Sequence, residues 1–107
     1  MTNFVQMMQK AKVFKEKMQD LQDRAAELEV EGSAGQGIVT CRMTGKHELK
    51  ALKVTPTLIN PQEAEVMEDM IIAAVNDARA KAQKRMEDES AKLMKEMGLP
   101  PNMELPF

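Results

Sequence analysis

The sequence has no tryptophan, no tyrosine and only three phenylalanines among its 107 residues. A platform that stacks the bases of single-stranded nucleic acid needs exposed aromatic rings, so this kind of binding is not expected. The chain has one cysteine, Cys41, and one histidine, His47. One residue of each cannot assemble a transition-metal site of the usual type within one chain, so we expect no metal ion and no cofactor. A lone cysteine also excludes an internal disulfide, which fits a reducing cytosol.

Long apolar runs and reactive side-chain constellations are also missing. No apolar stretch approaches the 18 residues of a membrane span, and residues 1–6 lack the basic and apolar regions of a secretory signal. We find no nucleophile with a partnered base; His47 is expected in a solvent-exposed turn and Cys41 as a partly buried thiol. The sequence therefore predicts that the protein is not an enzyme and has no catalytic residues.

Two long helices are predicted. The first spans about Asn3 to Glu29, where apolar residues recur at alternating gaps of three and four. The second begins with Asn60 as its cap and Pro61 at the first helical position, and continues to about Met97. The apolar seam of the first helix comprises Phe4, Met7, Ala11, Phe14, Met18, Leu21, Ala25 and Leu28.

A short antiparallel sheet is predicted between the helices. Gly32–Gly37 holds three glycines and predicts the break that ends the first helix. Alternating apolar and polar residues predict strands at Ile38–Thr44 and Glu48–Thr55, joined by a hairpin turn at Gly45–His47. A short edge strand at Glu29–Glu31 is the third one expected. The fold class is therefore α+β, with one α-β-β-β-α domain over residues 1–98 and a proline-rich tail over residues 99–107.

The lengths of the helices predict a homodimer. At 1.5 Å per residue the last helix is about 55 Å long and the first about 40 Å, whereas a compact domain of this size has a radius of gyration of about 13 Å. The helices must then overhang the globule, and their apolar seams need a cover. A small sheet with exposed edges also favours pairing with its own copy. The predicted interface residues are Val39, Cys41, Met43, Leu52, Val54 and Ile71.

Two basic clusters are candidates for binding DNA phosphates, because the net charge of −2 gives no overall attraction to a polyanion. The first helix carries one cluster, interrupted only by Glu16. The last helix carries the other, with no acid between Ala78 and Met86. If the two helices pair antiparallel, we expect both clusters to meet on one arm. The alternative for each lysine is a solvated helix face with i,i+4 partners. The candidates are Lys10, Lys12, Lys15, Lys17, Arg79, Lys81, Lys84 and Arg85.

Several short motifs occur in a characteristic order along most of the chain. They are Gln6-Met7-Met8, Lys17-Met18, Val30-Glu31-Gly32, Gly35-Gln36-Gly37-Ile38-Val39, Gly45, Val54-Thr55-Pro56 and Ala73-Ala74-Val75-Asn76-Asp77-Ala78. In this order and spacing the chain resembles the YbaB/EbfC family of nucleoid-associated proteins. Two departures lie in turns or strand ends: Gln36 stands where the family favours glycine, and Val54-Thr55-Pro56 replaces an Ile-Asp-Pro-like string.

The resemblance implies a tweezer-like homodimer whose sheets form the centre and whose helices project as arms. It further implies binding to double-stranded DNA, a change in DNA conformation, a place in the bacterial cytoplasm and nucleoid, and a role in nucleoid organisation or gene regulation. It implies no membrane and no small-molecule substrate. From the residues alone, a helical protein-interaction scaffold without nucleic-acid binding remains the alternative, because the chain is slightly acidic and rich in methionine.

Overall fold

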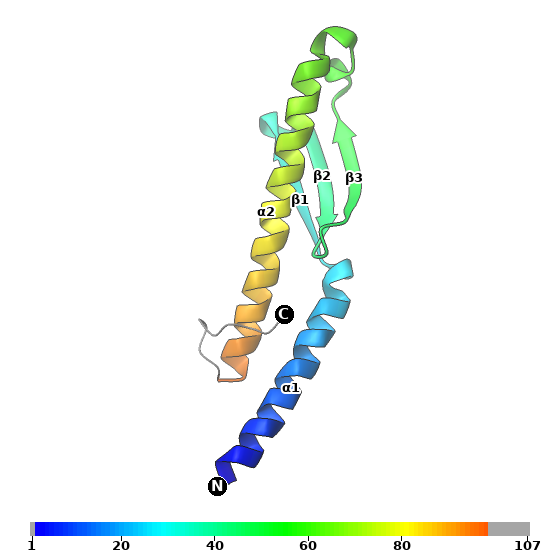
Figure 1. Ribbon diagram of the computed structural model, residues 1–107. Coiled ribbons are helices and arrows are strands. Elements are labelled where there is room, and N and C mark those ends of the chain that lie inside the picture. Colours follow the sequence, from blue (N-terminus) through cyan, green and yellow to red (C-terminus); the bar gives the residue numbers. More distant parts are fainter. Residues whose placement is uncertain (1, 99–107) are drawn as a thin grey trace.

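The computed structural model describes residues 2–98 (Figure 1). A long helix leads into a three-stranded antiparallel sheet, and a second long helix runs back across it, which confirms the predicted α+β class. The proline-rich tail predicted over residues 99–107 lies outside the described residues. The helices and strands are α1 (Thr2–Arg24), β1 (Glu29–Ala34), β2 (Val39–Thr44), β3 (Leu49–Val54) and α2 (Ala64–Glu96).

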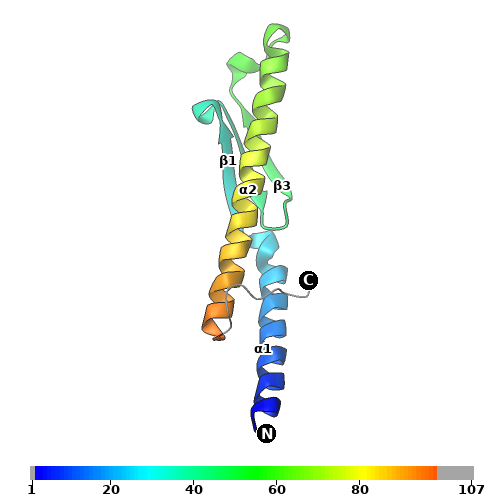
Figure 2. The same ribbon diagram turned by 60° about the vertical axis from the view of Figure 1, so that its left-hand side comes forward.

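The molecule is strongly elongated, as the helix lengths predicted. It measures 72 × 22 × 18 Å, and its radius of gyration is 19.4 Å. A compact chain of this length would have a radius of gyration of about 13 Å. The sheet and the first half of α2 form one end, and α1 extends away from them (Figures 1 and 2). In both views the N-terminal end of α1 projects past the end of α2.

The core lies between α2 and one face of the sheet. The strands are ordered β1-β2-β3, and α2 packs mainly on β1 and β2. From the helix, Ala74, Ala78 and Ala82 are fully buried. These small side chains allow the helix to lie close to the strands, and small apolar residues spaced four apart share one helix face. Opposite them, β2 buries Val39, Cys41 and Met43 in the same cluster.

Gly32 explains why the first strand is longer than predicted. We expected Gly32–Gly37 to break the chain, but β1 continues to Ala34 and the turn is confined to Gly35–Gly37. A Cβ atom on Gly32 would overlap the carbonyl oxygen of Ala74 and lie 2.6 Å from the backbone nitrogen of Ala78. This glycine therefore serves the close approach of helix and strand rather than a turn. Within the turn, Gln36 adopts a left-handed φ of 59°, the conformation for which glycine is favoured.

The two helix ends near the sheet also differ in detail from prediction. Helix α1 stops at Arg24, and a 3-10 turn follows over Ala25–Glu27. The backbone N–H of Gly45 donates to the carbonyl oxygens of Ala25 and Leu28, so the hairpin holds the chain where it leaves the helix. At the start of α2, Asn60 caps a 3-10 turn over Pro61–Glu63 that leads into the helix, since its side chain accepts from two backbone N–H groups. The α-helix itself begins at Ala64 rather than at Pro61.

Candidate nucleic-acid interface

The two helices pair antiparallel, which is the condition under which the two basic clusters would meet. Near the sheet, Ala25 in the turn after α1 and Met86 of α2 both approach Gly45. At the other end of α2, Met97 lines a shallow hollow with residues of α1 that include Gln6 and Val13. Between these ends the helices bury Met18, Leu21 and Met94. The early part of α1 therefore lies beside the end of α2 and continues beyond it.

The lysines of α1 form the less neutralised of the two basic clusters. Between Thr2 and Lys17 the helix has four lysines and only one acidic residue, Glu16. Within residues 2–98, no carboxylate lies within 4.0 Å of the ammonium groups of Lys10, Lys12, Lys15 or Lys17. All four residues are exposed. Because they sit on the projecting helix, they are accessible to a large anion.

These four lysines lie on two sides of α1. Lys10 and Lys17 are seven residues apart and share a face, which is the side toward α2. Lys17 lines a groove of about 290 Å³ between the helices, with Arg24, Glu89 and Glu96 among its other walls. Neither Lys12 nor Lys15 lines that groove. The latter two therefore present their charge on the open side of the arm.

Three of the four candidate cations in α2 are paired along their own helix. The Lys84 Nζ atom is 3.4 Å from a carboxylate oxygen of Asp88, and Arg85 Nε is 3.3 Å from one of Glu89. Exposed i,i+4 pairs of this kind are worth only a few tenths of a kcal/mol, so they can exchange partners. The neighbouring carboxylates nevertheless repel a phosphate. Arg79 has no carboxylate within 4.0 Å among residues 2–98.

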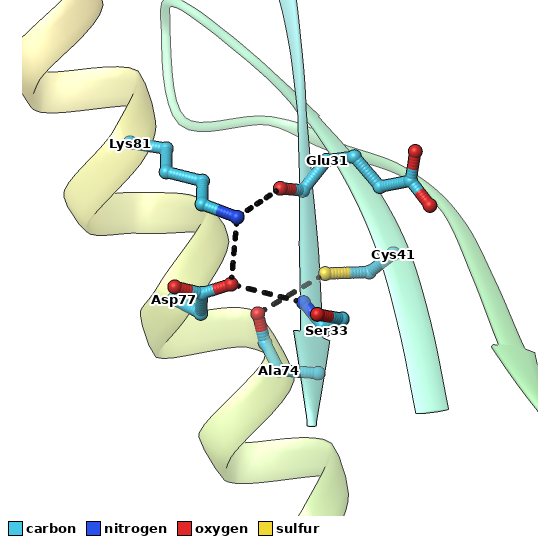
Figure 3. Close-up of polar contacts among 6 residues, drawn as sticks. All are labelled: Glu31, Ser33, Cys41, Ala74, Asp77 and Lys81. Atoms are coloured by element: carbon cyan, nitrogen blue, oxygen red, sulfur yellow. Dashed lines mark hydrogen bonds and ion pairs between the residues drawn. The ribbon is translucent and has the colours of Figure 1, made fainter. Parts of the chain in front are cut away.

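Lys81 joins helix and sheet (Figure 3). Its Nζ atom donates to the backbone oxygen of Glu31 at 3.1 Å and lies 3.0 Å from Asp77 Oδ2. The same carboxylate oxygen accepts the backbone N–H of Ser33 at 3.0 Å. The hydrogen bond from Ser33, followed by that from Lys81, lowers the pKa of Asp77 below its ordinary value. We call this set of contacts the Asp77–Lys81 clip. Sequence analysis did not find it, because it depends on two backbone groups of β1.

The structure does not bring the two basic clusters together. Ala25 and Met86 lie at the same level, so Arg79–Arg85 lies beside β1, whereas Lys10–Lys17 lies beside and beyond the end of α2. From Lys84 to Glu96 the helix rises by about 18 Å. The expectation that both clusters meet on one arm is therefore wrong. The reason is that α1 ends at the hairpin and leaves the first half of α2 to the sheet.

Three of the predicted interface residues are buried within the chain itself. Val39, Cys41 and Met43 pack under α2, with exposed fractions of 0%, 2% and 4%. The Cys41 thiol donates to the carbonyl oxygen of Ala74 at 3.3 Å, and burial raises its pKa. A second copy could contact these three side chains only if α2 moved away. The alternation of apolar residues in the sequence identified the inner face of β2. It could not show that α2 of the same chain covers this face.

The other interface candidates lie at the open margin of the core. Val54 and Ile71 are partly buried against it, and Leu52 is 45% exposed. A register shift between Arg42 and Met43 sets Leu49 opposite Met43, so Leu49 lies on the same face as Leu52 and is 43% exposed. Simple alternation places these two leucines on opposite faces, so sequence analysis missed Leu49. Because α2 lies over β1 and β2, the inner face of β3 stays uncovered.

Two other kinds of site are absent from residues 2–98. No helix in this range combines the length and apolar character needed to cross a membrane. No three histidine, cysteine, aspartate or glutamate side chains within the same range cluster closely enough to hold a metal ion.

A half-covered sheet and a projecting lysine-bearing helix define an elongated α+β protein with an exposed cationic arm. The model described as the YbaB/EbfC DNA-binding family matches residues 1–97, and the chain belongs to this family. The resemblance found in the sequence is thereby confirmed, as is the prediction that the protein is not an enzyme, since this is a family of nucleoid-associated DNA-binding proteins.

Similar proteins support the same assignment. A nucleoid-associated protein of Nitrobacter winogradskyi is 42% identical over 103 residues, which are 96% of this chain and 97% of that protein. A nucleoid-associated protein of Agrobacterium fabrum is 41% identical over the full length of both chains. The crystal structure of an uncharacterized protein from Helicobacter pylori aligns with a TM-score of 0.63 at 19% identity. It covers 75% of this chain and 93% of that one, and this likeness concerns the fold alone.

Proposed function

We propose that the chain binds double-stranded DNA as a homodimer and alters its conformation in the bacterial nucleoid, with consequences for nucleoid organisation and gene expression. The observation that carries the proposal is the set of four lysines on the arm without carboxylate partners among residues 2–98. Nucleoid-associated relatives at about 41–44% identity support the setting. The cytoplasm follows from that setting.

Lys12 and Lys15 are the strongest candidates for phosphate contacts. They project on the open side of α1, and no acid precedes them in the helix. Lys10 and Lys17 lie on the side toward α2, closer to its acidic residues. Their contribution to phosphate binding is therefore smaller. In α2, Arg79, Lys84 and Arg85 form a second, weaker set, since two of the three are paired. Lys81 is bound in the clip and contributes least.

The homodimer would form at β3. On the outer edge of β1, the clip occupies the N–H of Ser33 and the carbonyl of Glu31, so a strand cannot add there. Within the described range, no side chain bonds to the outer edge of β3. An open edge next to an uncovered apolar face favours pairing with another copy. The interface would include Leu49, Leu52 and the flank of α2 at Ile71.

DNA binding is tested by the salt dependence of affinity for a short labelled duplex, measured by fluorescence anisotropy between about 50 and 200 mM salt. Each lost phosphate contact lowers the slope of log K against log salt by about 0.9. The double variant Lys12→Gln/Lys15→Gln removes two contacts per subunit and should lower the slope by about 3 to 4 for the dimer.

The matched control is Lys84→Gln/Arg85→Gln, which removes the same charge from paired cations and should change the slope by about 1 to 2. Equal effects of the two variants would contradict the preference for α1. No binding by the unmodified protein even at about 50 mM salt would refute the proposed function and favour a protein-interaction scaffold.

The dimer is tested by sedimentation velocity of two variants that differ by one position. Leu52→Glu places a charge on the uncovered inner face of β3, whereas Ala51→Glu places the same charge on the opposite face. We expect the first to dissociate the dimer and the second to leave it intact. A monomeric unmodified protein, or a dimer that tolerates Leu52→Glu, would contradict the proposed interface.

A further inference from the structure

The free end of α1 carries large apolar side chains as well as lysines. Phe4 is 68% exposed and Met8 is 59% exposed. This end of the helix projects past the end of α2 (Figures 1 and 2), so α2 does not cover it. Val5 and Met7 are exposed too, so the apolar side chains are grouped at this end of the helix. Such a group marks an interaction surface, here for a partner that accepts both apolar and positively charged groups.

Phe4 and Met8 belong to the same helix stripe as the two open lysines. Residues four, four and three apart share a helix face, so Phe4, Met8, Lys12 and Lys15 form one row. A second row starts from Phe4 through Met7 and runs into the seam buried against α2 at Met18. The first row, from Phe4 to Lys15, does not run into the contact with α2, since neither of its lysines lines the groove between the helices.

The order along this row suits duplex DNA better than a lipid surface. A helix that lies in a membrane interface buries an apolar face along its whole length. Here the apolar part ends after Met8, and lysines continue the row at about 12 and 16 Å from Phe4 along the axis. Many proteins that bind the minor groove and kink DNA insert a short apolar wedge between base pairs, while cations nearby bind the phosphates.

We propose that Phe4 and Met8 act as a wedge that enters a base step and unstacks it, while Lys12 and Lys15 hold the phosphates about four base pairs away. The inference rests on the proposed DNA binding and assigns the change in DNA conformation to two side chains. Flexible pyrimidine–purine steps such as TA would be preferred, because they unstack most easily. Two arms in a dimer would deform the duplex at two places.

The test uses short duplexes in which 2-aminopurine replaces adenine at TA steps, since its fluorescence rises when a neighbouring base unstacks. The same samples give binding by anisotropy. With saturating unmodified protein we expect the fluorescence to rise at least twofold. The variant Phe4→Ala/Met8→Ala should bind with an unchanged salt slope but produce no rise. Met7→Ala, an equally exposed neighbour on the other row, is the matched control and should retain the rise.

The lysine variant Lys12→Gln/Lys15→Gln should bind more weakly yet still raise the fluorescence at saturation. A saturated complex without any rise, or a rise retained by Phe4→Ala/Met8→Ala, would overturn the wedge while DNA binding stands. An absence of anisotropy change would instead refute the proposed function itself. Loss of flotation with phosphatidylglycerol vesicles in the Phe4→Ala/Met8→Ala variant, with unchanged DNA distortion, would overturn the proposal in favour of a lipid partner.

Discussion

Gly32 is the position where the smallest change should disturb the fold most. Adding one methyl group in Gly32→Ala places a carbon atom 2.6 Å from the backbone nitrogen of Ala78 and in overlap with the carbonyl oxygen of Ala74. Ordinary contact begins at 3.4 Å, so α2 must retreat from β1 by about an ångström. Backbone atoms cannot rotate away as a side-chain end can. The helix must therefore move as a unit.

The cost can be worked out from what this movement loosens. Overpacking a core typically costs about 1–3 kcal/mol. A gap of about 0.5–1 Å also forfeits a quarter to a half of the attraction between the alanines of α2 and the sheet. The hydrogen bond from Ser33 to Asp77 lengthens as well, at about 1 kcal/mol. Alanine regains about 0.5–1 kcal/mol through its lower entropy when unfolded. We therefore expect a net loss of about 3 kcal/mol.

Thermal unfolding followed by circular dichroism, at one fixed protein concentration, measures this loss. A loss of about 3 kcal/mol lowers the Tm of a domain of this size by roughly 12–24 °C. Gly37→Ala is the control, because Gly37 has a φ of 95° and no atom within 4 Å of an added Cβ. It introduces backbone strain alone, at about 1–2 kcal/mol. A Tm for Gly32→Ala equal to or above that of Gly37→Ala would refute the close-approach argument.

Three further predictions concern single side chains. Because the pKa of Asp77 is lowered on folding, this carboxylate stabilises the fold fully above its ordinary pKa of 3.8. The stabilisation is lost as the pH falls through the lower pKa of the folded state. The urea midpoint of the unmodified protein should therefore drop in this range, and that of Asp77→Asn should drop less. Cys41 is buried with a raised pKa, so a thiol reagent at neutral pH should label it only after guanidinium unfolds the chain, and rapid native labelling would contradict its burial. Asn60→Ala removes the acceptor of two backbone N–H groups and should lower the free energy of unfolding, measured by urea denaturation, by about 1 kcal/mol. An unchanged free energy would show that the cap does not stabilise the fold.

Sequence periodicity was sufficient for the elements of this fold but not for their distances. The gaps of three and four in α1, the Asn60–Pro61 turn that leads into α2 and the alternation in β2 each follow from local chemistry. The role of Gly32 depends instead on how near α2 comes to β1, and the position of Leu49 depends on an irregular register. Such features arise from tertiary packing, which a pattern of residue types does not contain.

The candidate site was predictable in composition and not in arrangement. All eight candidate cations were proposed from their clustering in the sequence. The acids one turn after Lys84 and Arg85 can be seen in the sequence. The different role of Lys81 required the structure, because this side chain binds the backbone of β1. The exposed state of Phe4 also followed only from the relative lengths of α1 and α2 beyond the hairpin. Residue spacing shows which charges share a face of a helix. Which of these faces stays exposed depends on the helix or strand that packs against it.

The sideways position of α2 on the sheet connects the proposed dimer with the proposed arms. Because α2 lies over β1 and β2, its clip closes the β1 edge and leaves β3 uncovered. Pairing at β3 would join two sheets at their open edges and set the two α1 helices on opposite sides of the junction, each still free to carry Phe4 and Lys12 outward. If β1 were the open edge instead, the partner would contact α2 beside Lys84 and Arg85, and the basic residues there would be covered. In the proposed dimer, the clip would thus determine which cations are free to contact DNA.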